Sequence, residues 1–561
     1  MGNKKTSLKT AIENELSGDK ALQNAAYISQ FLRAPGSKGL HTVLNFIEEK
    51  LIQNNLDKIE KIKYPSKEYN TEEMSFTGWD VSNAKLEIVE PFYKEITSFE
   101  QAPTSIQWWS SSTPPHGVTA ELVDVGTGVD EKCYKGIDVK GKIVLATGEN
   151  QVEGNTRAFQ LAVEEHGALG LITDSLPYAQ PPLRTRVNHP EAISFLRIRT
   201  KSDKGWAFAL SLSMGEHLRE LMKKGPVKIR ATVDAEYKDE KDWEIIGEIT
   251  GNEKPEEEVW FVLHCSGPKP GANCASGAAL GMEIARTIKT LIDNGDIPRP
   301  NRTIKFLIGV EGDGLNAYLQ TKRDENVDVK AAFVFCSVGD DQNKCGSSLL
   351  MYRSPDSIPS YVNDICADAV EMFSNDAFTP YSAKHFDVPL TRFSIRPYTP
   401  MSDNSRLMTM KIPCPLFWSW PSRHFHTQFY TVDKLDPNVM KKCGLVAAYS
   451  AIKIADAGRN EALQFAHIIR LKTFSRMQEI TKTALTDAGE HLQQDMTADY
   501  IEKLNYTLER DINSIETVKN LFSYPDKELE EEIQMIVDEL KEASKLEIST
   551  IQRYKKILES K

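Results

Sequence analysis

The stretch HCSGPKPGANCASGAALGMEIART, residues 264–287, decides how the rest of the chain is interpreted. It follows a short, fully apolar run, VWFVL (259–263), which is typical of a buried strand. The glycines and prolines behind that run predict a loop, and residues 278–294 are predicted as a helix. A histidine and two cysteines therefore lie where a buried strand gives way to a helix.

Strand and helix patterns alternate further along the chain. Residues 303–310, 330–336 and 415–420 are predicted as strands, and residues 314–323 and 359–373 as helices. This alternation predicts an α/β fold, with a mixed, mostly parallel sheet covered by helices on both faces. In such sheets ligands bind at the loops that follow the carboxyl ends of the strands.

Four regions are expected along the 561 residues. Residues 1–117 combine N-terminal helices with a β segment, and residues 118–248 show short β-branched strands closed by glycines, which predicts a compact insert. Residues 249–458 form the α/β body. Residues 459–561 are helical by pattern and favour packing on the body or on a partner, which leaves a homo-oligomer through these helices open.

The composition of the chain argues against nucleic acid and membranes as binding partners. A net charge of -12 argues against nucleic acid, because phosphate binding needs clustered Lys and Arg. No stretch approaches the roughly 18 uncharged apolar residues of a membrane helix. The N-terminal stretch lacks the apolar core of a secretory signal, and the eight cysteines are irregularly spaced. We therefore expect a cytoplasmic protein with reduced thiols and no membrane partner.

Four side chains at the predicted strand ends have the chemistry of metal ligands. They are His264 and Cys274 in the first loop, Cys336 after a later strand, and His426 near the last strand. Two imidazoles and two thiols suit a tetrahedral zinc site, with iron as a lesser candidate. Their spacing matches no local zinc motif, so buried cysteines and hydrogen-bonded histidines stay an open alternative.

Three further features have a functional and a structural interpretation. Arg353 is a candidate for holding a substrate carboxylate, or it forms a structural ion pair. Trp108 and Trp109 predict a buried aromatic corner or a substrate platform. Asp340 and Asp341 are candidates for an additional oxygen ligand.

Segments of the chain, in order, resemble the co-catalytic zinc aminopeptidases of metallopeptidase family 28. The resemblance covers about residues 260–458, and it implies a zinc exopeptidase-like fold. Residues 118–248 resemble the protease-associated domain inserted in that family, and residues 74–92 are similar to the N-terminal part of members with this insert. The motifs are GPKPGANCASGAALGMEIARTI (267–288), RPNRTIKFLIGVEGDGLNAYL (299–319), AAFVFCSVGDDQ (331–342) and RHFHTQFYTVDKL (423–435).

The resemblance carries over some functional residues and not others. His264 takes the place of the family's histidine that ends the first strand and binds a metal, and His426 matches the last histidine ligand. Glu311 takes the place of the general base. The family's neighbouring glutamate, a metal ligand, is Gly312 here.

Two further ligand positions carry thiols. The family loop GANDNASG holds an aspartate that bridges two metals, whereas residues 271–277 read GANCASG, so Cys274 replaces that aspartate or the aspartate is deleted. Cys336 stands where another aspartate ligates a metal, and Asp403 matches an element beside the substrate cleft. Because a bridging carboxylate holds the two cations about 3.5–4 Å apart, its loss argues against a standard two-metal centre.

Three functions remain open from the sequence. The first is an aminopeptidase-like or amide-bond hydrolase, with one zinc ion on the four nitrogen and sulfur donors, Glu311 as general base, and a peptide or small amide as substrate. The second is a catalytically inactive pseudo-peptidase that binds peptides or a partner. The third is a repurposed thiol- or metal-dependent peptide-tailoring enzyme, in which Cys274, Cys336 or Cys265 is the nucleophile and a histidine its base.

Overall fold

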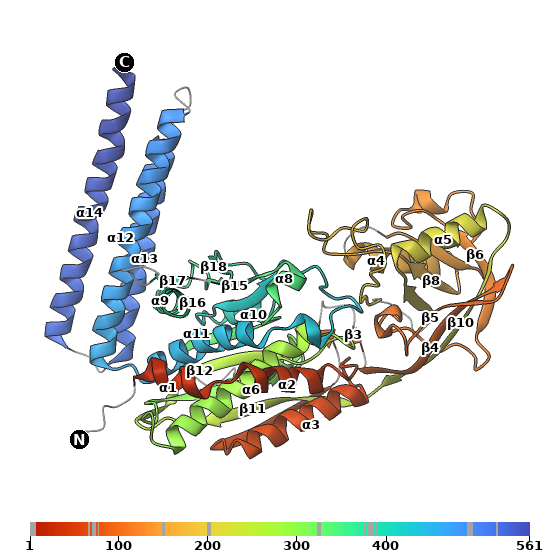
Figure 1. Ribbon diagram of the computed structural model, residues 1–561, viewed down its shortest axis with the longest axis horizontal. Helices are drawn as coiled ribbons and strands as arrows, with labels where there is room; N and C mark the ends of the chain where they lie inside the picture. The colour runs from red at the N-terminus through yellow and green to blue at the C-terminus, as the bar shows by residue number, and fades with distance from the viewer. Residues whose placement is uncertain are drawn as a thin grey trace.

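The computed structural model describes most of the chain and contains two large sheets and a bundle of long helices (Figure 1). This arrangement confirms the predicted α/β class. The described residues are 7–65, 68–69, 75–76, 78–148, 152–198, 204–322, 327–374, 377–379, 386–388, 390–490, 497–522 and 526–560.

The main sheet has eight strands. In spatial order they are β1 (Lys58–Pro65), β11 (Lys241–Ile249), β13 (Arg302–Gly309), β12 (Lys254–His264), β14 (Asp328–Phe335), β19 (Leu416–Trp420), β15 (Ser348–Tyr352) and β18 (Phe393–Arg396). β12 pairs in parallel with β13 and β14, and β14 pairs in parallel with β19, whereas β1, β11 and β15 add antiparallel pairs. Every residue of β13 is buried, as expected for a sheet covered on both faces.

Helices pack closely on this sheet. α6 contacts β12 and α2, and α11 contacts α6, α2 and the central strands. Several of these helices come from the N-terminal region, so residues far apart in sequence share one core. The helices are α1 (Leu8–Glu15), α2 (Gly18–Ile28), α3 (Lys38–Gln53), α6 (Ala272–Asp293), α7 (Asp313–Thr321), α9 (Val362–Phe373) and α11 (Pro437–Ala455).

The small residues of α6 explain how near it lies to the sheet. A Cβ on Gly277 would lie 2.6 Å from the carbonyl oxygen of Cys336, and one on Gly281 would lie 2.1 Å from the Leu263 side chain. The helix begins at Ala272, earlier than the predicted start at residue 278. Cys274 therefore lies in its first turn rather than in a loop.

The second sheet has seven strands and its own hydrophobic core. It includes β4 and β5, which precede residue 118, and it excludes β11, which belongs to the main sheet. We therefore propose that the insert spans residues 78–238 rather than the predicted 118–248; its resemblance to a protease-associated domain stays a prediction. In spatial order the strands are β5 (Lys94–Ser98), β4 (Gly78–Glu90), β10 (Lys228–Lys238), β6 (Val118–Asp124), β7 (Ile143–Ala146), β8 (Gly170–Thr173) and β9 (Trp206–Ala209).

The C-terminal extension is a bundle of three helices that projects from one end of the body (Figure 1). They are α12 (Arg459–Glu490), α13 (Thr497–Glu516) and α14 (Lys527–Glu559). Within the described parts of the chain, no helix has the length and apolar character needed to cross a membrane.

Shorter elements complete the fold. They are α4 (Val152–Phe159), α5 (Leu212–Met222), α8 (Gln342–Cys345), α10 (Asn404–Thr409), the 3-10 segments η1 (Pro103–Ser105), η2 (Glu131–Tyr134), η4 (Val432–Lys434) and η5 (Thr517–Leu521), the π-helical η3 (Gln160–Glu165), and the strand pairs β2 (Glu68–Tyr69) with β3 (Ser75–Phe76) and β16 (Ala377–Thr379) with β17 (Phe386–Val388).

Candidate functional site

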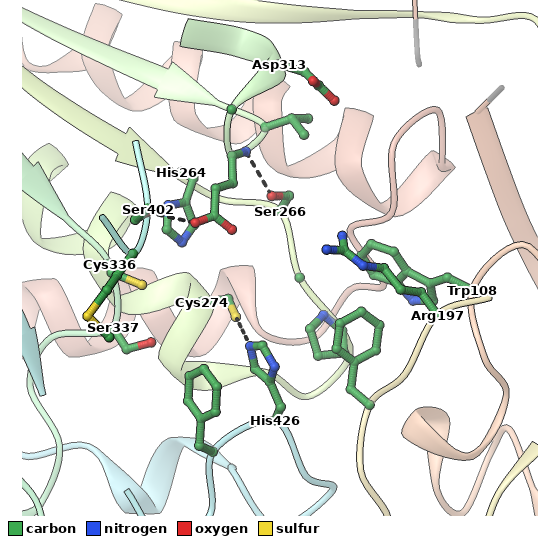
Figure 2. A pocket seen from close by; sticks show the side chains of 18 of the residues that line it. Trp108, Arg197, His264, Ser266, Cys274, Asp313, Cys336, Ser337, Ser402 and His426 are labelled. Atoms are coloured by element: carbon green, nitrogen blue, oxygen red, sulfur yellow. Dashed lines mark hydrogen bonds between the residues drawn. The ribbon is translucent and has the colours of Figure 1, made fainter. Parts of the chain in front are cut away.

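A cavity of about 560 Å³ opens at the carboxyl ends of the central parallel strands (Figure 2). Its walls come from the loops after β12, β13 and β14, from the start of α6, and from the insert. Five of the seven predicted site residues line it, which are His264, Cys274, Glu311, Cys336 and His426.

Cys274 faces the cavity from the third residue of α6. Its Sγ lies 3.9 Å from Nε2 of His426, in a hydrogen-bond contact (Figure 2). Burial raises the pKa of the Cys274 thiol to about 12, although the positive charges of His264 and Arg33 favour the thiolate. At neutral pH Cys274 is therefore a neutral thiol.

Arg33 braces the loop that leads to Cys274. Its guanidinium is fully buried and donates hydrogen bonds to the carbonyl oxygens of Cys265 and Gly271, at 2.7 and 3.0 Å. It also donates to the carbonyl oxygens of Ile28 and Phe31. The N-terminal helices thereby fix the loop at both ends, a role that the sequence motifs did not indicate.

His426 is held by rings and by a strained backbone. The imidazole stacks on Phe425 at 3.8 Å between centroids and meets the edges of Phe195 and Tyr178. Its φ of 54° lies in the left-handed region, which is uncommon for residues other than glycine. Burial, with smaller effects from nearby arginines, lowers the pKa of His426 to about 3, so the imidazole is neutral.

Strained backbone is concentrated around this cavity. Among the described residues, five that are not glycine have positive φ, and three of them, Trp109, Tyr178 and His426, line the cavity. Such conformations persist where the surrounding structure enforces them, and they cluster at active sites and ligand clamps. This clustering supports the choice of the cavity as the candidate functional site.

His264 and Cys336 form a second interaction between an imidazole and a thiol in the cavity. Its Nδ1 lies 3.6 Å from Oδ2 of Asp403. Burial disfavours the charged imidazole, but Glu311, Asp403 and the Cys336 thiol together outweigh it and raise the pKa of His264 well above its usual value. His264 is therefore positively charged, unlike His426, while Asp403 lies behind the wall of the cavity.

Glu311 is exposed in the cavity at the end of β13. Its Oε1 accepts a hydrogen bond from the Ser402 hydroxyl at 2.7 Å, and its backbone N–H donates to Ser266 Oγ at 3.1 Å (Figure 2). The next residue, Gly312, donates from its N–H to Oδ1 of Asp403 at 2.8 Å. The carboxylate of Glu311 is thus oriented and accessible to a ligand.

The metal centre implied by the family resemblance does not fit these residues. Within the described part of the chain, no group of three or more His, Cys, Asp or Glu side chains is arranged to hold a metal ion. At the position of the family's second glutamate, a Cβ on Gly312 would lie 2.5 Å from Nη2 of Arg406, so an arginine occupies that space. The predicted zinc or iron site stays a prediction, and no step below depends on a metal.

Three predicted residues have structural roles instead. Arg353, expected to bind substrate, lies outside the cavity, with Nη1 3.5 Å from Oδ1 of Asp364. The Cys265 thiol is fully buried and donates to the carbonyl oxygen of Gly309 at 3.4 Å. Asp340 is buried and accepts a hydrogen bond from the Tyr430 hydroxyl. The structure thus gives Arg353 the ion pair that the sequence left open as an alternative, and its role in substrate binding stays a prediction.

The other predicted residues lie partly outside the cavity and partly at its wall. Asp341 accepts hydrogen bonds from the backbone N–H groups of Asn343 and Lys344 at the start of α8 and is not part of the cavity wall. Trp108 and Trp109 are buried, as expected for an aromatic corner, and they also border the cavity, so a role as a substrate platform stays a prediction.

Several wall residues were missed by sequence reasoning. Ser402 and Arg406 lie beside Asp403, so the motif around Asp403 was the signal that could have found them. Phe195 and Tyr178 come from the insert. Their position depends on how the insert folds against the body, which no local pattern encodes.

Comparisons with known proteins agree with this geometry. Neither a protein-family profile nor a curated protein sequence matches the chain. Among solved structures it is similar to a peptidase M28 precursor from Shewanella amazonensis, at 17% identity over 80% of this chain and 96% of that one, with a TM-score of 0.57. It is also similar to the zinc aminopeptidase BSAP of Bacillus subtilis, at 15% identity over 78% and 94%, with a TM-score of 0.53.

The central parallel strands and the cavity at their carboxyl ends define an exopeptidase-type α/β fold. More specifically, the chain has the M28 metallopeptidase fold, which confirms the fold expected from the sequence motifs. At these identities the similarity concerns the fold, and the chemistry rests on the residues of the cavity.

Proposed function

We propose that this chain carries out amide-bond chemistry on peptides, with Cys274 as the nucleophile and His426 as its base. The observation that carries the proposal is the 3.9 Å contact between Sγ and Nε2 at the wall of the cavity. The fold shared with an aminopeptidase supports peptides as the substrate class. A thiol within reach of an imidazole is the arrangement that nucleophilic catalysis requires.

In the proposed reaction, Nε2 of His426 accepts the Cys274 proton while Sγ forms a bond to the carbonyl carbon of the amide. The carbon–nitrogen bond then breaks, and His426 returns the proton to the departing amine. The thioester that remains on Cys274 is hydrolysed by water. Because both partners start neutral, proton transfer accompanies attack, as in the serine–histidine pair of serine hydrolases.

Two charged neighbours support this assignment. Glu311, our candidate general base, is accessible in the cavity and accepts a hydrogen bond from Ser402, so it is positioned to activate the water that attacks the thioester. The positively charged His264 lines the same cavity and favours negative charge on the reacting atoms.

The experiment measures release of the amine from phenylalanine p-nitroanilide and from short peptides with a free N-terminus. We expect Cys274→Ala and His426→Asn to lower kcat/KM by about 10²-fold or more, because each removes one half of the reacting pair. Asn is chosen at position 426 because it tolerates left-handed backbone. The control is Cys133→Ser, which removes a partly exposed thiol of the insert that does not line the cavity and leaves activity unchanged.

Other outcomes would decide against the thiol mechanism. If a chelator abolishes amide cleavage and zinc restores it, the single-metal hydrolase is correct. If no substrate is turned over and no acyl group accumulates on Cys274, the pseudo-peptidase is correct. The observation that favours this second candidate is the position of Arg406, which fills the space of a glutamate on which the family's chemistry depends.

A further inference from the structure

Arg406 is a charged residue of the cavity wall that the proposed reaction does not use. It belongs to α10 and lines the cavity next to Glu311, Gly312 and Ser402. A Cβ on Gly312 would lie 2.5 Å from Nη2 and 2.7 Å from Cζ of Arg406. The guanidinium can lie against the backbone there only because residue 312 has no side chain.

The acidic groups near Arg406 have other partners. Glu311 accepts from the Ser402 hydroxyl at 2.7 Å. One oxygen of Asp403 accepts from the N–H of Gly312 at 2.8 Å, and the other faces His264 at 3.6 Å. Across the portions of the chain that the structure describes, no hydrogen bond or ion pair to the guanidinium of Arg406 is found.

An arginine whose guanidinium has no partner within the described part of the protein is suited to bind an anionic ligand. A guanidinium stays charged at all physiological pH values and presents five N–H donors in a fork that matches a carboxylate. Here it lies at the wall of a cavity rather than on an open surface, so water competes less with a bound anion.

Aromatic rings form much of the remaining wall of the cavity. The insert contributes Trp108, Tyr178 and Phe195, and β19 contributes Trp418 and Trp420. These rings favour an apolar or aromatic body in the ligand. Arg406 shares this wall with a second arginine, Arg197, and its guanidinium beside aromatic rings favours a molecule with a carboxylate attached to an apolar group.

We propose that Arg406 binds a carboxylate of the peptide that occupies this cavity, so that the preferred ligands are short peptides that present a carboxylate together with an apolar or aromatic residue. This inference rests on the proposed function only for the statement that the ligand is a peptide. The carboxylate comes from the C-terminus of a dipeptide or from an acidic side chain, and the experiment separates these sources.

The test measures binding by calorimetry near neutral pH, with the full chain carrying Cys274→Ala so that no probe is consumed. The probes are leucyl-phenylalanine, its C-terminal amide, and glutamyl-phenylalanine amide. We expect at least one of the two carboxylate probes to bind about tenfold or more tightly than leucyl-phenylalanine amide. Arg406→Met should abolish this preference, and Arg406→Lys should retain part of it, because lysine keeps the charge but not the fork.

The matched control is Arg423→Met, which removes the same charge from an exposed arginine that does not line the cavity and should leave the preference unchanged. Equal binding of all three probes, no measurable binding of any probe, or a preference that survives in Arg406→Met would each overturn the inference. Because the binding protein already lacks Cys274, these outcomes do not depend on whether that thiol is the nucleophile.

Discussion

At the scale of single residues, the cavity pairs two groups that keep one protonation state over a wide pH range. Burial raises the pKa of Cys274 to about 12 and lowers the pKa of His426 to about 3. Between these values the thiol is protonated and the imidazole is neutral. A reaction that uses this pair therefore does not change with pH through titration of either group in that interval.

The unchanged protonation states of Cys274 and His426 predict how the labelling rate of Cys274 with iodoacetamide depends on pH. In the wild-type protein we expect the labelling rate of Cys274 to be nearly flat between about pH 5 and pH 9, because His426 accepts the proton as the thiol attacks. In His426→Asn the rate at neutral pH should be lower and should rise about tenfold per pH unit, since only the rare thiolate then reacts. Peptide mapping by mass spectrometry measures the rate at each cysteine.

Cys133 serves as an internal reference in the same experiment. Burial of this thiol is outweighed by hydrogen bonds from Thr127 and from the backbone, and the pKa of Cys133 is lowered. Its labelling should therefore rise with pH up to that pKa and then level off, in the wild-type protein and in His426→Asn alike. A tenfold rise per pH unit at Cys274 in the wild-type protein would show that His426 takes no part.

At the scale of elements, the glycines of α6 set the position of the reactive thiol. Gly277 faces the backbone oxygen of Cys336, whereas Gly281 faces the end of the Leu263 side chain. A backbone atom cannot move aside without shifting its strand, but a leucine side chain can change rotamer. The two positions therefore differ in how much volume they tolerate.

We expect Gly277→Ala to lower the free energy of unfolding by about 1–3 kcal/mol, because the new methyl group forces α6 away from β14. Gly281→Ala, the matched variant, should cost less, since Leu263 can adjust and alanine is the better helix former by about 1 kcal/mol. Urea unfolding of both variants measures the difference. Equal costs would mean that α6 is not held at Cys336 as the structure indicates.

The sequence predicts the elements well and the site only in part. Strands such as 303–310 and helices such as 359–373 agree with the structure to within a few residues, because their apolar periodicity is strong. His264 and Cys274 were found because their loop follows a buried strand. Arg406 was not found: the motif around Asp403 indicates its neighbourhood, but its place beside Gly312 is a property of the packed structure.

At the scale of the whole molecule, the helical extension is attached to the body by buried charges. Nη1 of Arg476 on α12 lies 2.7 Å from Oδ1 of Asp364 on α9, and its Nη2 lies 2.6 Å from Oδ2 of Asp511 on α13. Both carboxylates are almost fully buried. Arg476 also keeps the pKa of Asp364 below its usual value, against the opposing effect of burial.

Removing this arginine should therefore destabilise the protein. We expect Arg476→Ala to lower the free energy of unfolding by about 2–4 kcal/mol near neutral pH, because two buried carboxylates lose their main partner. As the pH falls through the lowered pKa of Asp364, the wild-type protein loses this stabilisation and the difference shrinks. Chemical unfolding at several pH values measures it, with the exposed Arg553→Ala as control. A constant difference across pH would argue that packing, not charge, is lost.

The loop that carries His426 is fastened to the insert through main-chain atoms. The N–H of Phe195 donates to the carbonyl oxygen of His426 at 2.6 Å, and the N–H of Ile193 donates to Gln428 at 2.8 Å. The position of the His426 imidazole therefore depends on the insert as well as on the α/β body that carries this loop. A protease cut or an antibody that loosened residues 193–195 would therefore displace His426 without entering the cavity.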